Sequence, residues 1–254
     1  MSSSISVVIP ALNEEATIAE VVTAIRADAP ESLIEILVID ADSRDDTAQR
    51  AKAAGATVYN WREILPTIDV RPGKGESLWR GVAAARGEII VFIDADLNHV
   101  PPRIVEKLTA PYTNPDIALV KADYSRSFAG APTGGGRVTE LCAKPLLRAL
   151  FPELSVINQP LGGEYAIRRS VASDLPFVGG YGVEIGLLID VAHTHGTHSI
   201  TQVPLGVRSH RNRPLEQLSP MADIVATTIL TRAGCDTQSS VFQRPALKSL
   251  PTDS

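Results

Sequence analysis

Residues 88–96 constrain the fold more than any other segment, because a strongly apolar run ends in two acids. Residues 89–93 (IIVFI) lead directly into Asp94-Ala95-Asp96. Such a run suits a central strand that is covered on both faces, and an open α/β sheet binds its ligands at the carboxyl ends of such strands. Carboxylates at positions i and i+2 can point to the same side, which suits a divalent cation with substrate phosphates completing its shell. The alternative interpretation is an Asp pair that opens a polar turn.

The first hundred residues alternate short apolar runs with amphipathic segments. The predicted strands are 6–9, 35–39, 57–59 and 89–93, and the predicted helices are 14–27, 45–54 and 76–85. This βαβ rhythm predicts an α/β fold with a mostly parallel sheet and right-handed crossovers. The turns after the strands should line one edge of the sheet. Neither a G-x-G-x-x-G motif nor a P-loop motif is present, which argues against dinucleotide and P-loop proteins.

The pattern is less regular after residue 96. We predict helices at 102–108, 137–150 and 216–232, a further helix that ends near residue 195, and strands at 118–124 and 199–207. Residues 234–254 are polar and punctuated by prolines, so we expect a loosely ordered C-terminal tail.

Composition and charge narrow the classes of partner. The chain has 254 residues, with 24 Lys and Arg against 29 Asp and Glu. A net charge of −5 argues against nucleic acid as a partner. Cys142 and Cys235 lack metal-type spacing, and no apolar stretch is long enough for a signal peptide or a membrane span. We therefore expect a cytoplasmic protein with reduced thiols and no membrane contact.

Three other segments could contact phosphate or metal. Lys74 lies in a glycine-containing turn before a helix, where it either contacts a phosphate or is a solvated turn lysine. Glycines 134–136 precede the helix that starts at Arg137, which gives either a phosphate cradle or a plain flexible loop. His210 follows a strand and could be a metal ligand, an acid or base, or a turn residue.

Seven motifs together resemble the glucosyl-3-phosphoglycerate synthases, which are retaining glycosyltransferases with the GT-A fold, and their mannosyl-transferring relatives. The motifs are VVIPALNEE (7–15), RPGKGE (71–76), FIDADL (92–97), GGGRVTEL (134–141), QPLGGEYA (159–166), GYGVEIGLL (180–188) and LGVRSHRNRP (205–214). The resemblance implies one GT-A catalytic domain over residues 1–233. Its Rossmann-like nucleotide-sugar-binding half (1–100) would be continuous with an acceptor-binding half (101–233).

The resemblance also implies a role for individual residues. The donor-binding residues would be Pro10, Ala11, Leu12, Glu14, Asp40, Ala41, Lys74, Asp94, Ala95, Tyr181, Glu184 and Arg208. The acceptor-binding residues would be Gly136, Arg137, Val138, Thr139 and Asn212. Asp96 and His210 would hold Mg²⁺ or Mn²⁺, and the catalytic residues would be Asp96, Glu184, Lys74 and Arg208.

Two departures from the family pattern concern the donor. The family usually has D-S-G-S after the second strand and D-S-D at the metal, whereas this chain has Asp40-Ala41-Asp42-Ser43 and Asp94-Ala95-Asp96. Two hydroxyl groups that could contact the nucleotide are thus missing, and hydrogen bonds to a base are a common source of discrimination.

We expect a metal-dependent retaining transfer of a hexose, foremost glucose, from UDP-glucose or GDP-glucose to 3-phosphoglycerate. The nearer alternative is GDP-mannose as donor, or another phosphorylated or hydroxylated acceptor. Two alternatives from other classes are a sugar-phosphate nucleotidyltransferase and a non-catalytic nucleotide-binding module. A nucleotidyltransferase usually has a glycine-rich basic loop after the first strand, and this chain lacks one. A homodimer is one assembly that the sequence leaves open.

Overall fold

The structure is a computed structural model, and it describes residues 3–127, 136–209 and 215–251. Its main sheet has seven strands in the order β3-β2-β1-β4-β6-β5-β8. These strands are β1 (Ile5–Ala11), β2 (Leu33–Asp40), β3 (Thr57–Asn60), β4 (Ile89–Phe92), β5 (Leu119–Ser127), β6 (Tyr165–Arg168) and β8 (Ile200–Ser209). β1, β2, β3 and β4 are mutually parallel, and β5 is parallel to β8. The predicted α/β fold with a mostly parallel sheet is confirmed.

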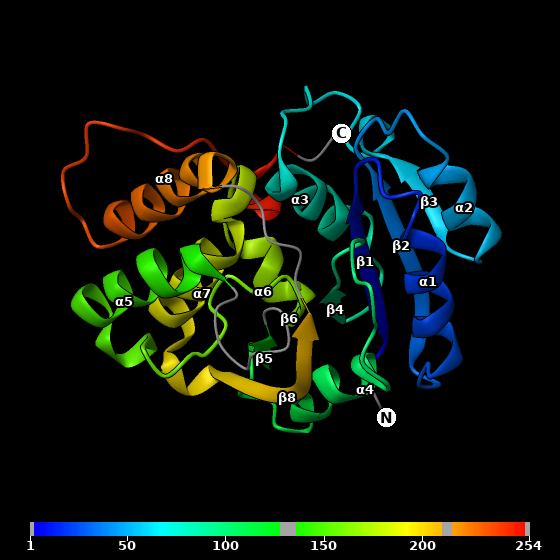
Figure 1. The fold of residues 1–254 in the computed structure, drawn as a ribbon, viewed down its shortest axis with the longest axis horizontal. Helices are drawn as coiled ribbons and strands as arrows, with labels where there is room; N and C mark the ends of the chain where they lie inside the picture. Colours follow the sequence, from blue (N-terminus) through cyan, green and yellow to red (C-terminus); the bar gives the residue numbers. More distant parts are fainter. Residues whose placement is uncertain (1–2, 128–135, 210–214, 252–254) are drawn as a thin grey trace.

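Helices cover both faces of this sheet (Figure 1). They are α1 (Ile18–Ala27), α2 (Thr47–Ala53), α3 (Lys74–Ala84), α4 (Ile104–Thr109), α5 (Lys144–Leu150), α6 (Arg169–Asp174), α7 (Val183–His195) and α8 (Leu215–Arg232). One core cluster joins a face of the sheet to α3, α5, α7 and α8, and the other joins the opposite face to α1 and α4. Successive residues of β1 alternate between them: Val7 and Ile9 pack toward α1, and Val8 packs with the cluster of α3.

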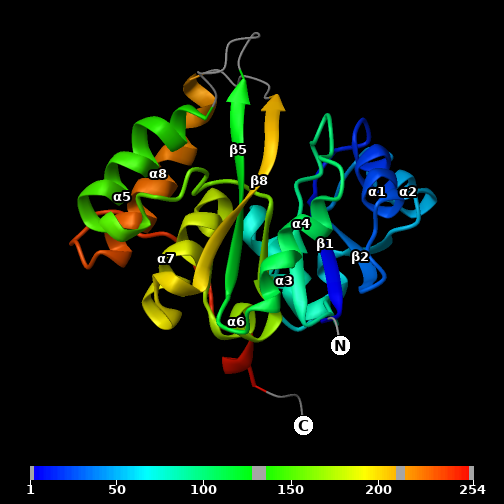
Figure 2. The same cartoon turned by 90° about the horizontal axis from the view of Figure 1, so that it is seen from below.

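The short strand β6 was not predicted from the sequence. It runs antiparallel to both β4 and β5, with Tyr165 opposite Phe92. Because of this reversal, the start of β6 lies beside the carboxyl end of β4, and Glu164 is brought next to the two acids that follow β4. Figure 2 shows the neighbouring pair of β5 and β8 running side by side beyond the rest of the sheet.

The C-terminal segment is held more firmly than its composition predicts. β9 (Gln243–Arg244) pairs antiparallel with β7 (Phe177–Val178) in a separate two-stranded sheet. The side chain of Arg244 is buried against Glu76 of α3. The expectation of a loosely ordered tail is therefore wrong for these residues, because a buried acid on α3 gives the tail a specific partner.

In the part of the chain that the structure describes, no helix is both long enough and apolar enough to cross a membrane.

Candidate active site

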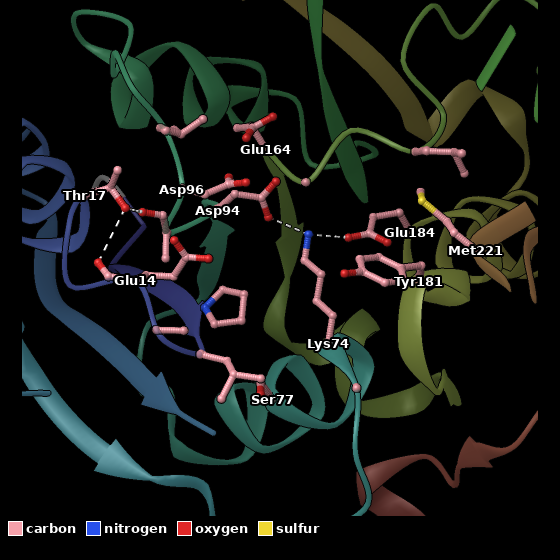
Figure 3. Close-up of a pocket in the computed structure, with 18 of the residues that line it drawn as sticks. Glu14, Thr17, Lys74, Ser77, Asp94, Asp96, Glu164, Tyr181, Glu184 and Met221 are labelled. Atoms are coloured by element: carbon pink, nitrogen blue, oxygen red, sulfur yellow. Dashed lines mark hydrogen bonds and ion pairs between the residues drawn. The ribbon is translucent and has the colours of Figure 1, made fainter. Parts of the chain in front are cut away.

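A cavity of about 910 Å³ opens at the carboxyl edge of β1 and β4. It is lined by the loop after β1, the start of α3, Asp94-Ala95-Asp96, the segment 136–139, and the starts of β6 and α7. The predicted gathering of polar turns at one edge of the sheet is confirmed. Figure 3 shows acids from separate segments of the chain around this cavity: Glu14, Asp94, Asp96, Glu164 and Glu184.

Lys74 lies between two of these acids. Its Nζ is 2.5 Å from Oδ1 of Asp94 and 2.7 Å from Oε1 of Glu184, and only 18% of the side chain is exposed (Figure 3). Burial alone would lower the pKa of Lys74, but the charges of Asp94 and Glu184 raise it well above its usual value. Lys74 therefore stays a fixed cation inside the cavity, and the alternative of a solvated turn lysine is wrong.

The position of Lys74 depends on a close approach of α3 to the segment before α7. Lys74 is the first residue of α3, and a Cβ on the next residue, Gly75, would lie 2.0 Å from the carbonyl oxygen of Val178. Only glycine permits the first turn of α3 to pack on this backbone. The contact places Lys74 within reach of Glu184, which stands in the first turn of α7.

Asp94 packs against the glycine pair of the QPLGGEYA segment. A Cβ on Gly163 would lie 2.3 Å from both carboxylate oxygens of Asp94. The lack of a side chain at position 163 thus lets β6 start directly beside the carboxylate. Asp94 is fixed by this contact on one side and by Lys74 on the other.

Asp96 is exposed on the wall of the cavity, beside Asp94 (Figure 3). Mg²⁺ and similar hard cations are commonly bound through one or two carboxylates, with substrate phosphates and waters filling the other positions. The described residues contain no group of three or more His, Cys, Asp and Glu that could hold a metal ion. The second predicted ligand, His210, lies outside the described residues. A carboxylate at the rim of a cavity fits a cation that is shared with a phosphorylated ligand.

The segment predicted to bind the acceptor phosphate lies on the same cavity. Gly136, Arg137, Val138 and Thr139 all line it. They lead into a π-helical turn, Thr139–Ala143, that continues as α5. π-Helical turns are frequent at functional sites, and amides at the start of a helix favour anions.

The predicted donor-binding residues mostly line the cavity as well. Those that line it are Pro10, Ala11, Leu12, Glu14, Ala41, Lys74, Asp94, Ala95, Tyr181 and Glu184. Asp40 does not: its buried carboxylate accepts a hydrogen bond from the Ser43 amide at 3.3 Å. The backbone of Arg208 lies in β8, and Asn212 lies outside the described residues. The roles of all these residues stay predictions, both for those that line the cavity and for Asp40, Arg208, His210 and Asn212.

Asp42 stands at the position where the family's D-S-G-S pattern has glycine. Its φ is +63°, a conformation that favours glycine, and Asp is among the few other residues that adopt it. Arg62 and Asn60 donate hydrogen bonds to its carboxylate. The hydrogen bonds from Arg62 lower the pKa of Asp42 to about 2. These partners keep the turn in the shape that glycine would give.

Sequence reasoning missed Lys121 and Glu164. Glu164 is buried and lines the cavity. Lys121 is 1% exposed; its Nζ donates to the Gly162 carbonyl at 2.7 Å and lies 4.6 Å from the centre of the Tyr165 ring. Burial lowers the pKa of Lys121 to about 8. The signals available in the sequence were a lysine that directly follows the apolar residues 118–120 of a predicted strand, and an acid within the QPLGGEYA motif.

A mostly parallel α/β sheet with paired acids after β4, beside one large cavity, fits the GT-A glycosyltransferases. The model of "Glycosyl transferase family 2" matches residues 6–152. The glucosyl-3-phosphoglycerate synthase of Mycolicibacterium paratuberculosis is 51% identical over 240 residues, which cover 91% of this chain and 73% of the relative. That of Petrotoga mobilis is 46% identical over 236 residues, with coverage of 90% and 73%.

Solved structures agree. The crystal structure of Mycobacterium tuberculosis glucosyl-3-phosphoglycerate synthase in complex with Mn²⁺, UDP-glucose and phosphoglyceric acid superposes with a TM-score of 0.90 at 47% identity. The match covers 97% of this chain and 90% of that one. The chain belongs to glycosyl transferase family 2 and, within it, to the glucosyl-3-phosphoglycerate synthases. The resemblance noted from the seven motifs is confirmed.

Proposed function

We propose that this protein transfers glucose from UDP-glucose to the 2-hydroxyl group of 3-phosphoglycerate, with retention of configuration. The products are glucosyl-3-phosphoglycerate and UDP. The observation that carries this proposal is that Asp94, Asp96, Lys74 and Glu184 share one cavity with the cradle at 136–139. The Mycobacterium tuberculosis relative at 47% identity binds Mn²⁺, UDP-glucose and phosphoglyceric acid.

The departing diphosphate needs positive charge around it. Asp96 and His210 would hold Mg²⁺ or Mn²⁺, which when bound neutralises charge on the leaving diphosphate. Lys74 supplies a fixed positive charge in a largely water-excluded position, where electrostatic stabilisation is strong. Arg208 would add a guanidinium to the same group.

The acceptor is oriented by its phosphate. Arg137 can donate paired hydrogen bonds to a phosphate, and the amides at the helix start favour the same anion. Thr139 adds a hydroxyl group. Held in this way, the 2-hydroxyl group of the acceptor would face the sugar of the donor.

The two carboxylates that pair with Lys74 are poorly suited to covalent catalysis. Both Asp94 and Glu184 form ion pairs with Lys74, which reduces their strength as nucleophiles. We therefore favour attack from the face of the leaving group, in which an oxygen of the departing diphosphate takes the proton of the acceptor hydroxyl. Glu184 orients the donor sugar.

A panel of UDP- and GDP-linked glucose and mannose, crossed with 3-phosphoglycerate and glycerate, tests the proposal. We expect release of UDP from UDP-glucose that depends on both the cation and 3-phosphoglycerate. Pyrophosphate release from UTP and glucose 1-phosphate, without UDP release, would instead identify a nucleotidyltransferase. The cytoplasmic location, the division of the domain into two halves and a homodimer remain predictions from the sequence.

A further inference from the structure

Residues 242–245 contact α3, which lines the cavity, and β7, which leads to Tyr181 and Glu184 of the cavity wall, although none of the four lines the cavity itself. This C-terminal strap, as we call residues 242–245, contains β9 and lies behind the starts of α3 and α7. It makes side-chain contacts with α3 and backbone contacts with β7 and the residue after it.

The side-chain contacts centre on Glu76, which stands in the first turn of α3, two residues after Lys74. Arg244 donates to both oxygens of Glu76, with its Nε 2.6 Å from Oε2 and its Nη2 2.8 Å from Oε1. Arg80 donates to Oε1 at 2.7 Å, and all three side chains are buried. Such a bidentate pair, in which one guanidinium makes two hydrogen bonds to one carboxylate, stabilises both side chains and also restricts their relative orientation.

The backbone contacts join the strap to the segment that leads into α7. Phe177 and Val178 pair with Arg244 and Gln243, and the Gly179 amide donates to the Phe242 carbonyl at 2.7 Å. The indole Nε1 of Trp79, one turn further along α3, donates to the Pro245 carbonyl at 2.9 Å. The strap therefore contacts both α3 and the β7 segment, by which we mean residues 177–179.

Side chains of the cavity lie on α3 and on the residues that follow the β7 segment. Lys74 begins α3, Tyr181 lies two residues after Gly179, and Glu184 follows in the first turn of α7. The ion pair of 2.7 Å between Lys74 and Glu184 joins these same two elements across the cavity. Its length depends on how α3 and the start of α7 are held relative to each other.

We propose that Arg244 is a positioning residue for the donor site. By holding Glu76, it fixes the first turn of α3 against the β7 segment, and so sets the place of Lys74 opposite Glu184. The expected effect on the donor rests on the function proposed above. The claim that Arg244 holds α3 against the β7 segment is independent of that function.

Three variants test it. Arg244→Met removes the charge and keeps much of the volume; Glu76 then still has Arg80, so the buried group is a balanced pair and the fold should stand. Arg244→Lys keeps the charge but cannot make the bidentate contact. Lys248→Ala is the matched control, because Lys248 lies four residues away in an exposed pair with Asp174.

Kinetics and hydrogen exchange are the two readouts. For Arg244→Met we expect KM for UDP-glucose to rise by about 10-fold, with KM for 3-phosphoglycerate unchanged and Arg244→Lys intermediate. Amides in residues 74–78 and 179–184 should exchange faster in Arg244→Met than in Lys248→Ala. An unchanged donor KM would overturn the inference, and so would an equal rise in both KM values, which marks a merely structural role.

The exchange measurement separates this inference from the proposed function, since it needs no substrate. If the wild-type protein uses no UDP-glucose, the proposed function fails, and the local exchange rates still decide the role of Arg244. Exchange that rises evenly over the whole chain, or in neither segment, would overturn it. If Arg244→Met does not fold, Arg244→Lys decides by the same two measurements.

Discussion

Gly163→Ala should disable the active site while leaving the fold standing. A methyl group at this position would lie 2.3 Å from both oxygens of Asp94, whereas ordinary contact begins near 3.4 Å. Gly163 does not have a positive φ, so alanine fits the backbone without strain. The carboxylate must then move by about 1 Å, and displacements of that size can cost a large factor in rate.

The magnitude follows from the ion pair that is lost. Moving Asp94 breaks its 2.5 Å contact with Lys74. A hydrogen bond between charged groups is worth roughly 1.5–3 kcal/mol, so kcat/KM should fall by about 10- to 150-fold. The free energy of unfolding should also fall, but by less than the worth of that contact, because Glu184 still pairs with Lys74 and because alanine restricts the unfolded chain, which stabilises by roughly 0.4–1 kcal/mol.

UDP release from UDP-glucose at saturating Mn²⁺ and 3-phosphoglycerate, together with thermal melting, measures both quantities. The control is Gly162→Ala, since the nearest atom there is the Tyr124 hydroxyl at 3.1 Å and a small shift relieves the contact. Activity of Gly163→Ala within about twofold of wild type would refute the reasoning, as would an equal loss in Gly162→Ala.

Four further variants probe the rest of the site. Asp96→Ala should abolish cation-dependent turnover without unfolding the protein; full activity, or wild-type activity in excess chelator, contradicts its role as metal ligand. Arg137→Ala should raise KM for 3-phosphoglycerate by about 10- to 150-fold with little change for the donor, and efficient use of glycerate would speak against the cradle. Ala41→Ser combined with Ala95→Ser should shift the UDP to GDP selectivity toward UDP by about 10- to 100-fold, and an identical kcat/KM ratio excludes these positions from reading the nucleotide. Burial lowers the pKa of Lys121 from 10.5 to about 8, so between these values the unfolded chain binds more protons and the free energy of unfolding should rise with pH, by up to roughly 3 kcal/mol. Denaturant titrations at several pH values should show no such rise in Lys121→Met.

The sequence was sufficient for the parts of the fold with a strong local signal. β4 is a continuous apolar run and β1 is largely apolar, and the acids that follow β4 mark the ligand edge of the sheet. β6 could not be predicted, because the four residues of Tyr165–Arg168 carry too little periodicity to identify a strand. Its direction is set by the neighbours β4 and β5, which are far away in the sequence.

Most of the predicted site residues line one cavity, but the contacts that they make with one another were not predicted. The motif containing Lys74 indicated a contact with phosphate, yet the two acids beside it come from different segments of the chain, after β4 and in α7. Arg244 gave no signal either. Its partner Glu76 lies far earlier in the sequence, and an arginine among prolines and polar residues is typical of a solvated tail.

The distance along the chain between Glu76 and Arg244 has a consequence for protein synthesis. The two residues are 168 positions apart, and the ribosome makes the chain from its N-terminus at about 5–20 residues per second. The strands β1 to β4 can therefore pair long before Arg244 emerges, and until then Glu76 has only Arg80 as its partner. We therefore expect the donor pocket to reach its final geometry only after residues 242–245 have been synthesised. A nascent chain that still lacks the strap should bind the nucleotide sugar weakly.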